Sequence, residues 1–114
     1  MHSDRNAGFL QDIGRNIELA TAFVNNMTVE EFEQDVLRVY AVTRSLEIIS
    51  EASRRLSGEL EARHPHIAWR EMAGAGNVYR HGYGGVAAKR IWETVRIALP
   101  PLHRAVQDEL SRII

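Results

Sequence analysis

The sequence contains no cysteine, only three prolines and only 7% aromatic residues. Without cysteine the chain has neither disulfide bonds nor thiolate chemistry. No apolar run approaches the roughly 18 residues that a membrane-spanning helix needs, and residues 1–6 lack the apolar stretch of a signal peptide. We therefore expect no membrane insertion and a cytoplasmic location.

The overall composition is that of a globular protein. Hydrophobic residues make up 45% of the chain and charged residues 25%, far from the composition of disordered chains. A chain of 114 residues is long enough to bury one core and too short for two independent ones. We expect a single domain over residues 1–114.

The net charge of −1 conceals an uneven distribution. Residues 1–65 hold seven Arg and Lys against eleven Asp and Glu, whereas residues 66–104 hold six against two. A basic segment attracts phosphate groups, yet charges spread this thinly are also typical of solvated helix faces. Charge alone therefore favours ordinary solvated helix faces over a phosphate-binding segment.

Apolar residues recur with the period of an α-helix along the whole chain, and the alternation typical of strands never persists. The first helix is expected over residues 4–25, with an apolar stripe formed by Phe9, Ile13, Ile17, Ala20 and Val24. Thr28 and Glu31 have the spacing of a capping box, which predicts a new helix beginning at Val29.

A longer amphipathic helix is expected over residues 36–62, joined to the preceding one by a bend near Asp35 and stopped by Pro65. Pro100 and Pro101 are expected to end or interrupt a later helix. Short connections between amphipathic helices favour antiparallel neighbours. The sequence thus predicts an all-α fold, an up-and-down bundle of four to five helices.

Residues 69–83, WREMAGAGNVYRHGY, hold the best candidates for chemistry. Asn77 and His81 are four residues apart, so on a helix they share one face and the amide can orient the imidazole. Arg80 lies about 100° around such a helix and adds positive charge at the edge of the same site. A histidine pKa of about 6.5 suits proton transfer in both directions. His81 is therefore the best general acid or base, although a capping role is the commoner one for a lone histidine.

Other candidate sites are weaker. His64 and His66 flank Pro65, but two imidazoles do not make a zinc site, and most such pairs are surface loop residues. The glycine-rich stretches GAGN and GYGG lack the preceding strand and the lysine of a nucleotide cradle. We expect neither a metal nor a cofactor.

Three blocks of the sequence are similar to one known family. They are MTVEEFEQD at 27–35, RSLEIISEASRRLS at 44–57 and IAWREMAGAGNVYRHGYGGVAAKRIWETVRIALPPL at 67–102. In their order and spacing they resemble the HEPN superfamily, specifically the HepT-like toxins. The resemblance covers most of the chain and implies a HEPN-like helical bundle.

The resemblance implies a metal-independent endoribonuclease. In such domains the motif is an Arg followed after four to six residues by a His, often with a polar residue beside the Arg and a Tyr two beyond the His. The matching positions here are Asn77, His81 and Tyr83, but Gly76 occupies the place of the Arg. The missing guanidinium would hold the scissile phosphate. Arg80 is a poor substitute because of its different angular position, and Arg70 is a weaker one.

The resemblance also implies partners. Two motifs meet across a homodimer interface, and a minimal nucleotidyltransferase antitoxin transfers adenylyl groups onto the Tyr of the motif. Tyr83 would be the acceptor of this modification, whereas from its residue type alone it would be an aromatic anchor of the bundle.

These observations leave three hypotheses open. The first is a HepT-like toxin component that cleaves RNA, with His81 as acid or base, Asn77 orienting it and Tyr83 as the modification site. The second, favoured by Gly76, is a catalytically inactive HEPN module for dimerisation and for binding a nucleotidyltransferase. The third is a nucleotide-binding regulatory bundle, which would need a pocket that the sequence does not reveal.

Overall fold

The computed structural model describes residues 2–74 and 85–113, and all regular secondary structure in that part of the chain is helical. The longest helices are α1 (His2–Val24), α3 (Val36–Arg54) and α7 (Leu99–Ile113). Shorter helical segments are α2 (Val29–Gln34), α4 (Gly58–Ala62), residues 69–74, α6 (Gly85–Glu93) and the π-helix η1 (Thr94–Ala98). The prediction of an all-α bundle is confirmed.

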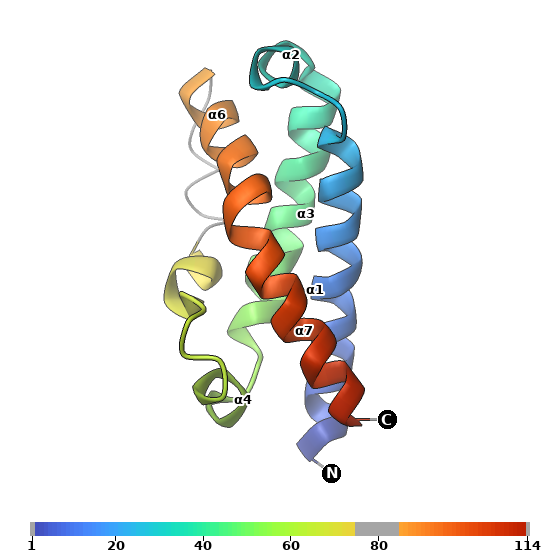
Figure 1. Cartoon of the computed structure of the whole chain (residues 1–114), viewed down its shortest axis with the longest axis vertical. Helices are drawn as coiled ribbons and strands as arrows, with labels where there is room; N and C mark the ends of the chain where they lie inside the picture. The colour runs from blue at the N-terminus through green and yellow to red at the C-terminus, as the bar shows by residue number, and fades with distance from the viewer. Residues whose placement is uncertain (1, 75–84, 114) are drawn as a thin grey trace.

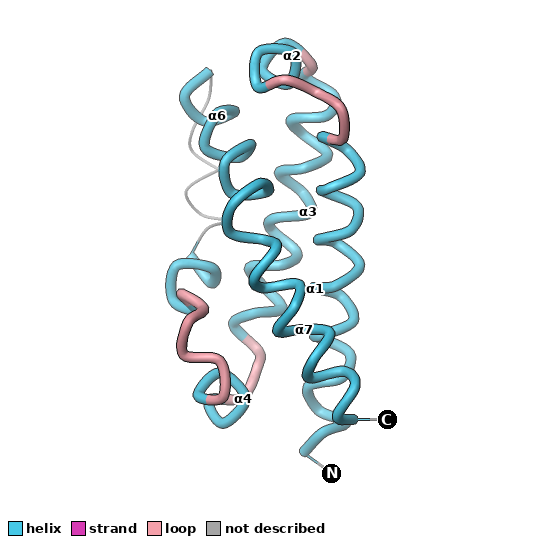
Figure 2. Tube along the Cα trace, in the orientation of Figure 1, coloured by secondary structure: helices cyan, strands magenta, loops and turns pink. Residues whose placement is uncertain are grey.

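Of the long helices, α1 runs up the molecule, and α3 and α7 run down it (Figure 1). The chain rises through α1, returns through α3, and later descends again through α6, η1 and α7, which form one continuous helical rod. Both termini lie at the same end (Figure 1), and the loops that Figure 2 marks lie at the ends of the bundle and beside residues 69–74. No helix among the described residues is long and apolar enough to cross a membrane.

The core lies where α1 packs against α3 and α7. The predicted stripe of α1 is buried from Ile13 to Val24, and Phe9 is partly buried against the same core. Across from it, Ile49 of α3 and Leu102 of α7 have no exposed surface. Burying each such side chain contributes roughly 1.5–3 kcal/mol, so this shared seam is the main source of stability.

The capping box predicted at Thr28 and Glu31 is present. The Thr28 hydroxyl accepts a hydrogen bond from the Glu31 N–H at 3.1 Å, and the Glu31 carboxylate accepts one from the Thr28 N–H at 2.8 Å. The expected bend is present as well, because Asp35 both ends α2 and caps α3 through a 3.1 Å bond from the N–H of Arg38. Phe32 on α2 is fully buried and so fixes α2 over the core.

The predicted helix over residues 36–62 is two helices, because α3 ends at Arg54 and α4 begins at Gly58. Ser57 makes the break: its hydroxyl accepts from the Leu60 N–H at 3.2 Å and from the side chain of Asn6, also at 3.2 Å. The Asn6 amide oxygen in turn accepts from the N–H of Ser57. An apolar stripe does not reveal such a break, since two consecutive helices can present their apolar faces to one core. The second of these helices, α4, ends at Ala62, the predicted end, three residues before Pro65.

The two prolines interrupt a helix without ending it. Pro100 and Pro101 lie inside α7, directly after the π-helix η1. Proline has no N–H and its ring clashes with the carbonyl four residues earlier. The chain avoids this clash by widening the preceding turn, and the Leu99 N–H bonds to the carbonyl of Thr94, five residues back.

The capping box gives a direct test of the fold. We expect Thr28→Ala to lower the free energy of unfolding by about 1 kcal/mol, because the Glu31 N–H loses its acceptor. The matched control is Thr21→Ala in the last turn of α1, where the hydroxyl donates to the carbonyl of Ile17 within the same helix. That variant should be neutral or slightly stabilising, since alanine has the higher helix propensity. Equal losses of unfolding free energy for the two variants, measured by urea unfolding, would contradict the assignment of Thr28 as the N-cap of α2.

Candidate active site

The residues predicted from the sequence to carry chemistry, Asn77, Arg80, His81 and Tyr83, lie outside the described residues, as does Gly76. The structure does describe the chain on both sides of them, up to Gly74 and from Gly85 onward. The described part of the candidate site therefore consists of the elements at these two ends of the chain and the charges around them.

The end that precedes the motif is fixed to α3. The Ser50 hydroxyl donates a hydrogen bond to the carbonyl oxygen of Ala73 at 2.6 Å, and Nη1 of Arg54 donates to the same oxygen at 2.5 Å. Ser50 is buried, with 1% of its surface exposed. Both bonds therefore join residues 69–74 to α3.

Arg54 belongs to a small cluster of charges on α3. The Glu51 carboxylate accepts from Nη2 of Arg54 at 2.6 Å and from Nε and Nη2 of Arg55 at 3.3 and 3.2 Å. The hydrogen bonds from Arg54, and then those from Arg55, lower the pKa of Glu51. One carboxylate thus faces two guanidinium groups, and the cluster keeps one net positive charge.

The start of the same segment is held by Trp69. Its indole N–H lies within hydrogen-bond distance of two carbonyl oxygens, 3.1 Å from that of Glu61 and 3.0 Å from that of His64. The side chain is partly buried against the core. Residues 69–74 are therefore fastened at one end to α4 and its following loop, and at the other end to α3.

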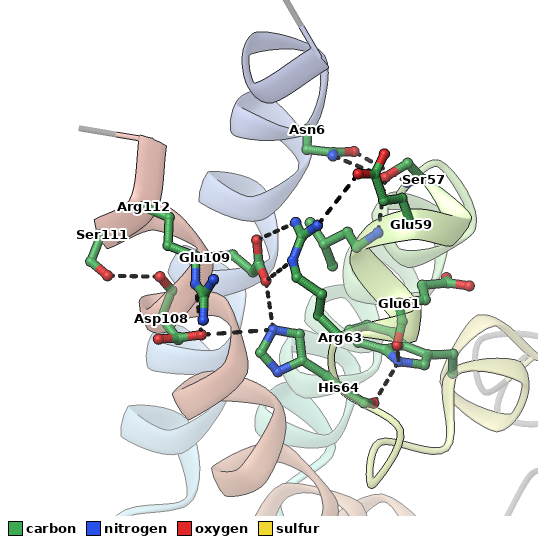
Figure 3. A network of polar contacts seen from close by, with 12 residues as sticks. Asn6, Ser57, Glu59, Glu61, Arg63, His64, Asp108, Glu109, Ser111 and Arg112 are labelled. Atoms are coloured by element: carbon green, nitrogen blue, oxygen red, sulfur yellow. Dashed lines mark hydrogen bonds and ion pairs between the residues drawn. The ribbon is translucent and has the colours of Figure 1, made fainter.

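His64, expected to be a surface loop residue, is buried with 7% of its surface exposed. Its Nε2 lies 2.7 Å from a carboxylate oxygen of Glu109, a buried residue of α7 (Figure 3). Arg63 donates to both oxygens of Glu109, from Nε at 3.0 Å and from Nη2 at 2.8 Å. The expectation for His64 was wrong because its partner is 45 residues away in the chain. His66, the other histidine of the pair, is exposed as expected.

This network is an ion-pair arrangement and a poor metal site. Ligand atoms of His64, Asp108 and Glu109 lie within 4.8 Å of one another. However, Arg63 already occupies both oxygens of Glu109, and its positive charge opposes a cation at the same place. The hydrogen bond from Arg63 is also the main cause that lowers the pKa of Glu109, and the same bond raises the pKa of Arg63.

Basic side chains are exposed around the elements that flank the motif. They are Arg70 before it and Lys89, Arg90 and Arg96 after it. No carboxylate among the described residues pairs with any of these four. The Arg96 guanidinium lies 5.2 Å from the ring centre of Trp92, in a cation–π contact. Exposed cations of this kind attract phosphate groups.

The structure also contains a groove between α1 and α7, of about 490 Å³, which bears on the hypothesis of a nucleotide-binding bundle. Its lining is mainly apolar, with Glu18, Asn25 and His103 among its polar members. His103 is 3.2 Å from the Glu18 carboxylate, so the groove presents no unpaired cation for a phosphate among the described residues. The groove gives the nucleotide hypothesis no support.

Sequence reasoning missed Ser50 and Arg54, which contact the segment that holds the motif. A signal was available, because Ser50 is four residues after the apolar Leu46 and so falls within the apolar arc of α3. A hydroxyl expected inside a core requires a partner. The sequence does not identify that partner, since Ala73 is 23 residues away.

Comparisons with known proteins agree with the resemblance noted above. The family model "Ribonuclease HepT-like" matches residues 13–109. A protein of Thermococcus cleftensis named "Probable ribonuclease HepT" is 39% identical over 94 residues, covering 82% of this chain and 86% of that protein. A "Putative RNase" of Caldanaerobacter subterraneus is 34% identical over 104 residues, covering 91% of this chain and 93% of that protein. No solved structure gave a significant match.

The buried Glu109 carboxylate predicts a pH dependence of stability. Since folding lowers its pKa from an ordinary value of 4.5, the carboxylate contributes stability above that pH, which is lost as the pH falls through the lowered pKa. We expect Glu109→Gln to lower the free energy of unfolding by about 2 kcal/mol at pH 7 and to flatten its decline between pH 5 and pH 3, which urea unfolding measures.

The matched control is Glu59→Gln. Glu59 also pairs with Arg63, at 3.9 Å, but its side chain is 80% exposed, against 4% for Glu109. This control should keep the stability and the acid slope of the unchanged protein. An acid slope that survives Glu109→Gln undiminished would show that other carboxylates govern it.

Proposed function

The chain belongs to the ribonuclease HepT-like family, and from this we propose that it is a metal-independent endoribonuclease, the toxin component of a toxin–antitoxin pair. The observation that carries the proposal is the family match over residues 13–109, together with a His-x-Tyr motif formed by His81 and Tyr83 within it. As proposed, the protein acts on RNA in the cytoplasm.

In the proposed reaction the RNA 2′-hydroxyl attacks the adjacent phosphorus, and the bond from phosphorus to the 5′ oxygen breaks. The products are a 2′,3′-cyclic phosphate and a free 5′-hydroxyl. His81 takes the proton from the attacking hydroxyl or supplies one to the leaving oxygen, and neither step needs a metal ion. Asn77, four residues earlier, orients the imidazole, and Arg80 adds positive charge.

The described surface supports an RNA substrate. Lys89, Arg90 and Arg96 are exposed on α6 and η1, which directly follow the motif in the chain, and Arg70 is exposed just before it. Phosphate contacts of this kind give affinity without sequence specificity. The RNA backbone is therefore proposed to approach along these two elements.

We further propose a homodimer and a nucleotidyltransferase partner, as the family resemblance implies. Val36, Leu37 and Tyr40 at the start of α3 are 62, 79 and 68% exposed. Clustered exposed apolar side chains are typical of protein contacts, which is consistent with an oligomer. The partner would transfer an adenylyl group from ATP to the phenolic oxygen of Tyr83, releasing pyrophosphate.

The ribonuclease proposal is tested by His81→Ala. We expect the unchanged protein to cleave single-stranded RNA in the presence of EDTA, and His81→Ala to reduce the rate by at least about 100-fold. Denaturing gels and detection of the cyclic phosphate end measure the reaction. His66→Ala is the matched control, since His66 is an exposed histidine outside the motif, and it should keep the full rate.

The alternative is an inactive module for dimerisation and partner binding, favoured by Gly76 in the place of the motif arginine. The variant Gly76→Arg distinguishes the active ribonuclease from the inactive module. If only this variant cleaves RNA, the natural protein is the inactive module. If the unchanged protein cleaves and His81→Ala does not, it is the enzyme.

The partner proposal has its own test. When a minimal nucleotidyltransferase from the same genome is supplied with ATP, we expect the mass of this protein to increase by whole adenylyl groups, because Tyr83 offers a phenolic nucleophile. Tyr83→Phe should abolish the increase, and Tyr79→Phe, at the other tyrosine of the sequence 69–83, should leave it unchanged. Intact-protein mass spectrometry decides between these outcomes, and an unmodified natural protein would refute the assignment.

A further inference from the structure

We propose that the start of α3 docks into the groove between α1 and α7 of a second copy of this chain. The docking element is a ridge of three exposed apolar side chains, Val36, Leu37 and Tyr40. The inference rests on the homodimer proposed above, and it names two surfaces that join the copies, both outside residues 75–84.

The ridge is one strip along α3. Tyr40 is three residues after Leu37 and four after Val36, so the three side chains share one face of the helix. Arg44, one turn further, continues this face with a positive charge, and its side chain is 72% exposed. An apolar strip that ends in a cation is complementary to an apolar groove that ends in an anion.

The groove has these complementary features. Its volume is about 490 Å³, its lining is mainly apolar, and along α1 it extends from Ile17 to Asn25. Glu18 provides a carboxylate at the Ile17 end, and its side chain is 64% exposed. Its pair with His103, at 3.2 Å, lies at the surface. Exposed pairs of this kind are weak, so Glu18 can accept a second cation.

The ridge and the groove lie at the same height along the bundle. α1 and α3 are antiparallel (Figure 1), and the side chain of Arg38 bonds the carbonyl of Phe23 at 2.9 Å. Both helices rise equally per residue, so each step forward along α3 is level with one step backward along α1. The contact between Asn6 and Ser57, near the other end of α1, agrees with this alignment.

This alignment matches the ridge to the groove. Tyr40, two residues after Arg38, is level with Thr21 of the groove lining. Arg44 is level with the end of the groove at which Glu18 lies. Within one copy, however, Arg44 and Glu18 have no contact among the described residues. The match can therefore be used only between two copies.

A two-fold axis parallel to α1 brings the two surfaces together. α1 packs against α3 on one flank and against α7 on another. A half-turn about such an axis exchanges these flanks and leaves every height unchanged, so α3 of one copy lies opposite the groove of the other. Tyr40 then meets the other copy's Thr21, and Arg44 meets the other copy's Glu18.

The symmetry makes this contact a closed one. Each copy contributes one ridge and one groove, and the same half-turn forms both contacts, as in an isologous dimer. Both ridges are thereby removed from water, and burial of apolar surface is the main favourable contribution to association. The paired charges of Arg44 and Glu18 fix the alignment of the copies.

Cross-linking tests the contact directly, because the natural sequence has no cysteine. Two variants are mixed, one with Tyr40→Cys and the other with Ala22→Cys, at an exposed residue of the groove lining. We expect a short bis-maleimide to join them into a covalent dimer, with the linked peptides identified by mass spectrometry. Gln11→Cys, exposed on α1 outside the groove, is the matched control and should not cross-link to Tyr40→Cys.

A charge exchange tests the pairing of Arg44 with Glu18. We expect Arg44→Glu and Glu18→Arg each to raise the dissociation constant of the copies about tenfold, because like charges then meet at both halves of the contact. The double variant should return to within about threefold of the unchanged protein. A structural role of either residue would not produce this rescue. Sedimentation measures the dissociation constant, and circular dichroism verifies folding.

Other results would overturn the inference. They are cross-links only between two ridges, equal yields for Gln11→Cys and Ala22→Cys, single reversals that leave association unchanged, and a double variant without rescue. Protection of Ala22→Cys from maleimide by a nucleotidyltransferase alone would assign the groove to that partner instead.

The failure of this inference is distinguishable from that of the proposed function. If the unchanged protein sediments as a monomer, the homodimer fails together with the inference. If it associates without the cross-link between Tyr40→Cys and Ala22→Cys, only the inference fails. RNA cleavage by the unchanged protein is a separate measurement and tests the ribonuclease proposal by itself.

Discussion

The structure depends on the burial of three apolar helix faces against one another, those of α1, α3 and α7. Ile13, Ile49 and Leu102 each come from a different one of these helices, and none has exposed surface. The hydrophobic effect that drives this burial is not directional. It decides which faces meet, and it leaves open the path of the chain between α3 and α6.

Directional polar contacts decide part of that path. Glu109 of α7 binds Arg63 and His64 just after α4, and the indole of Trp69 bonds backbone carbonyls of the same region. Ser50 and Arg54 then hold Ala73 on α3. Each of these groups is expensive to leave unpaired once buried. Together they fix the chain up to the last turn before the motif.

The sequence by itself determined the structural features that depend on residues one or two helical turns away. The stripe of α1, the capping box of Thr28 and the bend at Asp35 could all be predicted, because their partners are three or four residues away. The family also followed from the sequence, since its motifs are ordered along the chain.

Only the tertiary structure determined the features that depend on contacts between residues far apart in the sequence. Ser57 divides the expected long helix with the help of Asn6, 51 residues away, and His64 is buried by Glu109. The contact of Arg54 with Ala73 is of the same kind. Periodicity reports which face of a helix is apolar, and it carries no information on which distant polar group folding brings to that face. The contacts that fix residues 69–74 are therefore known from the fold, and the residues proposed to act in the reaction are known from the sequence.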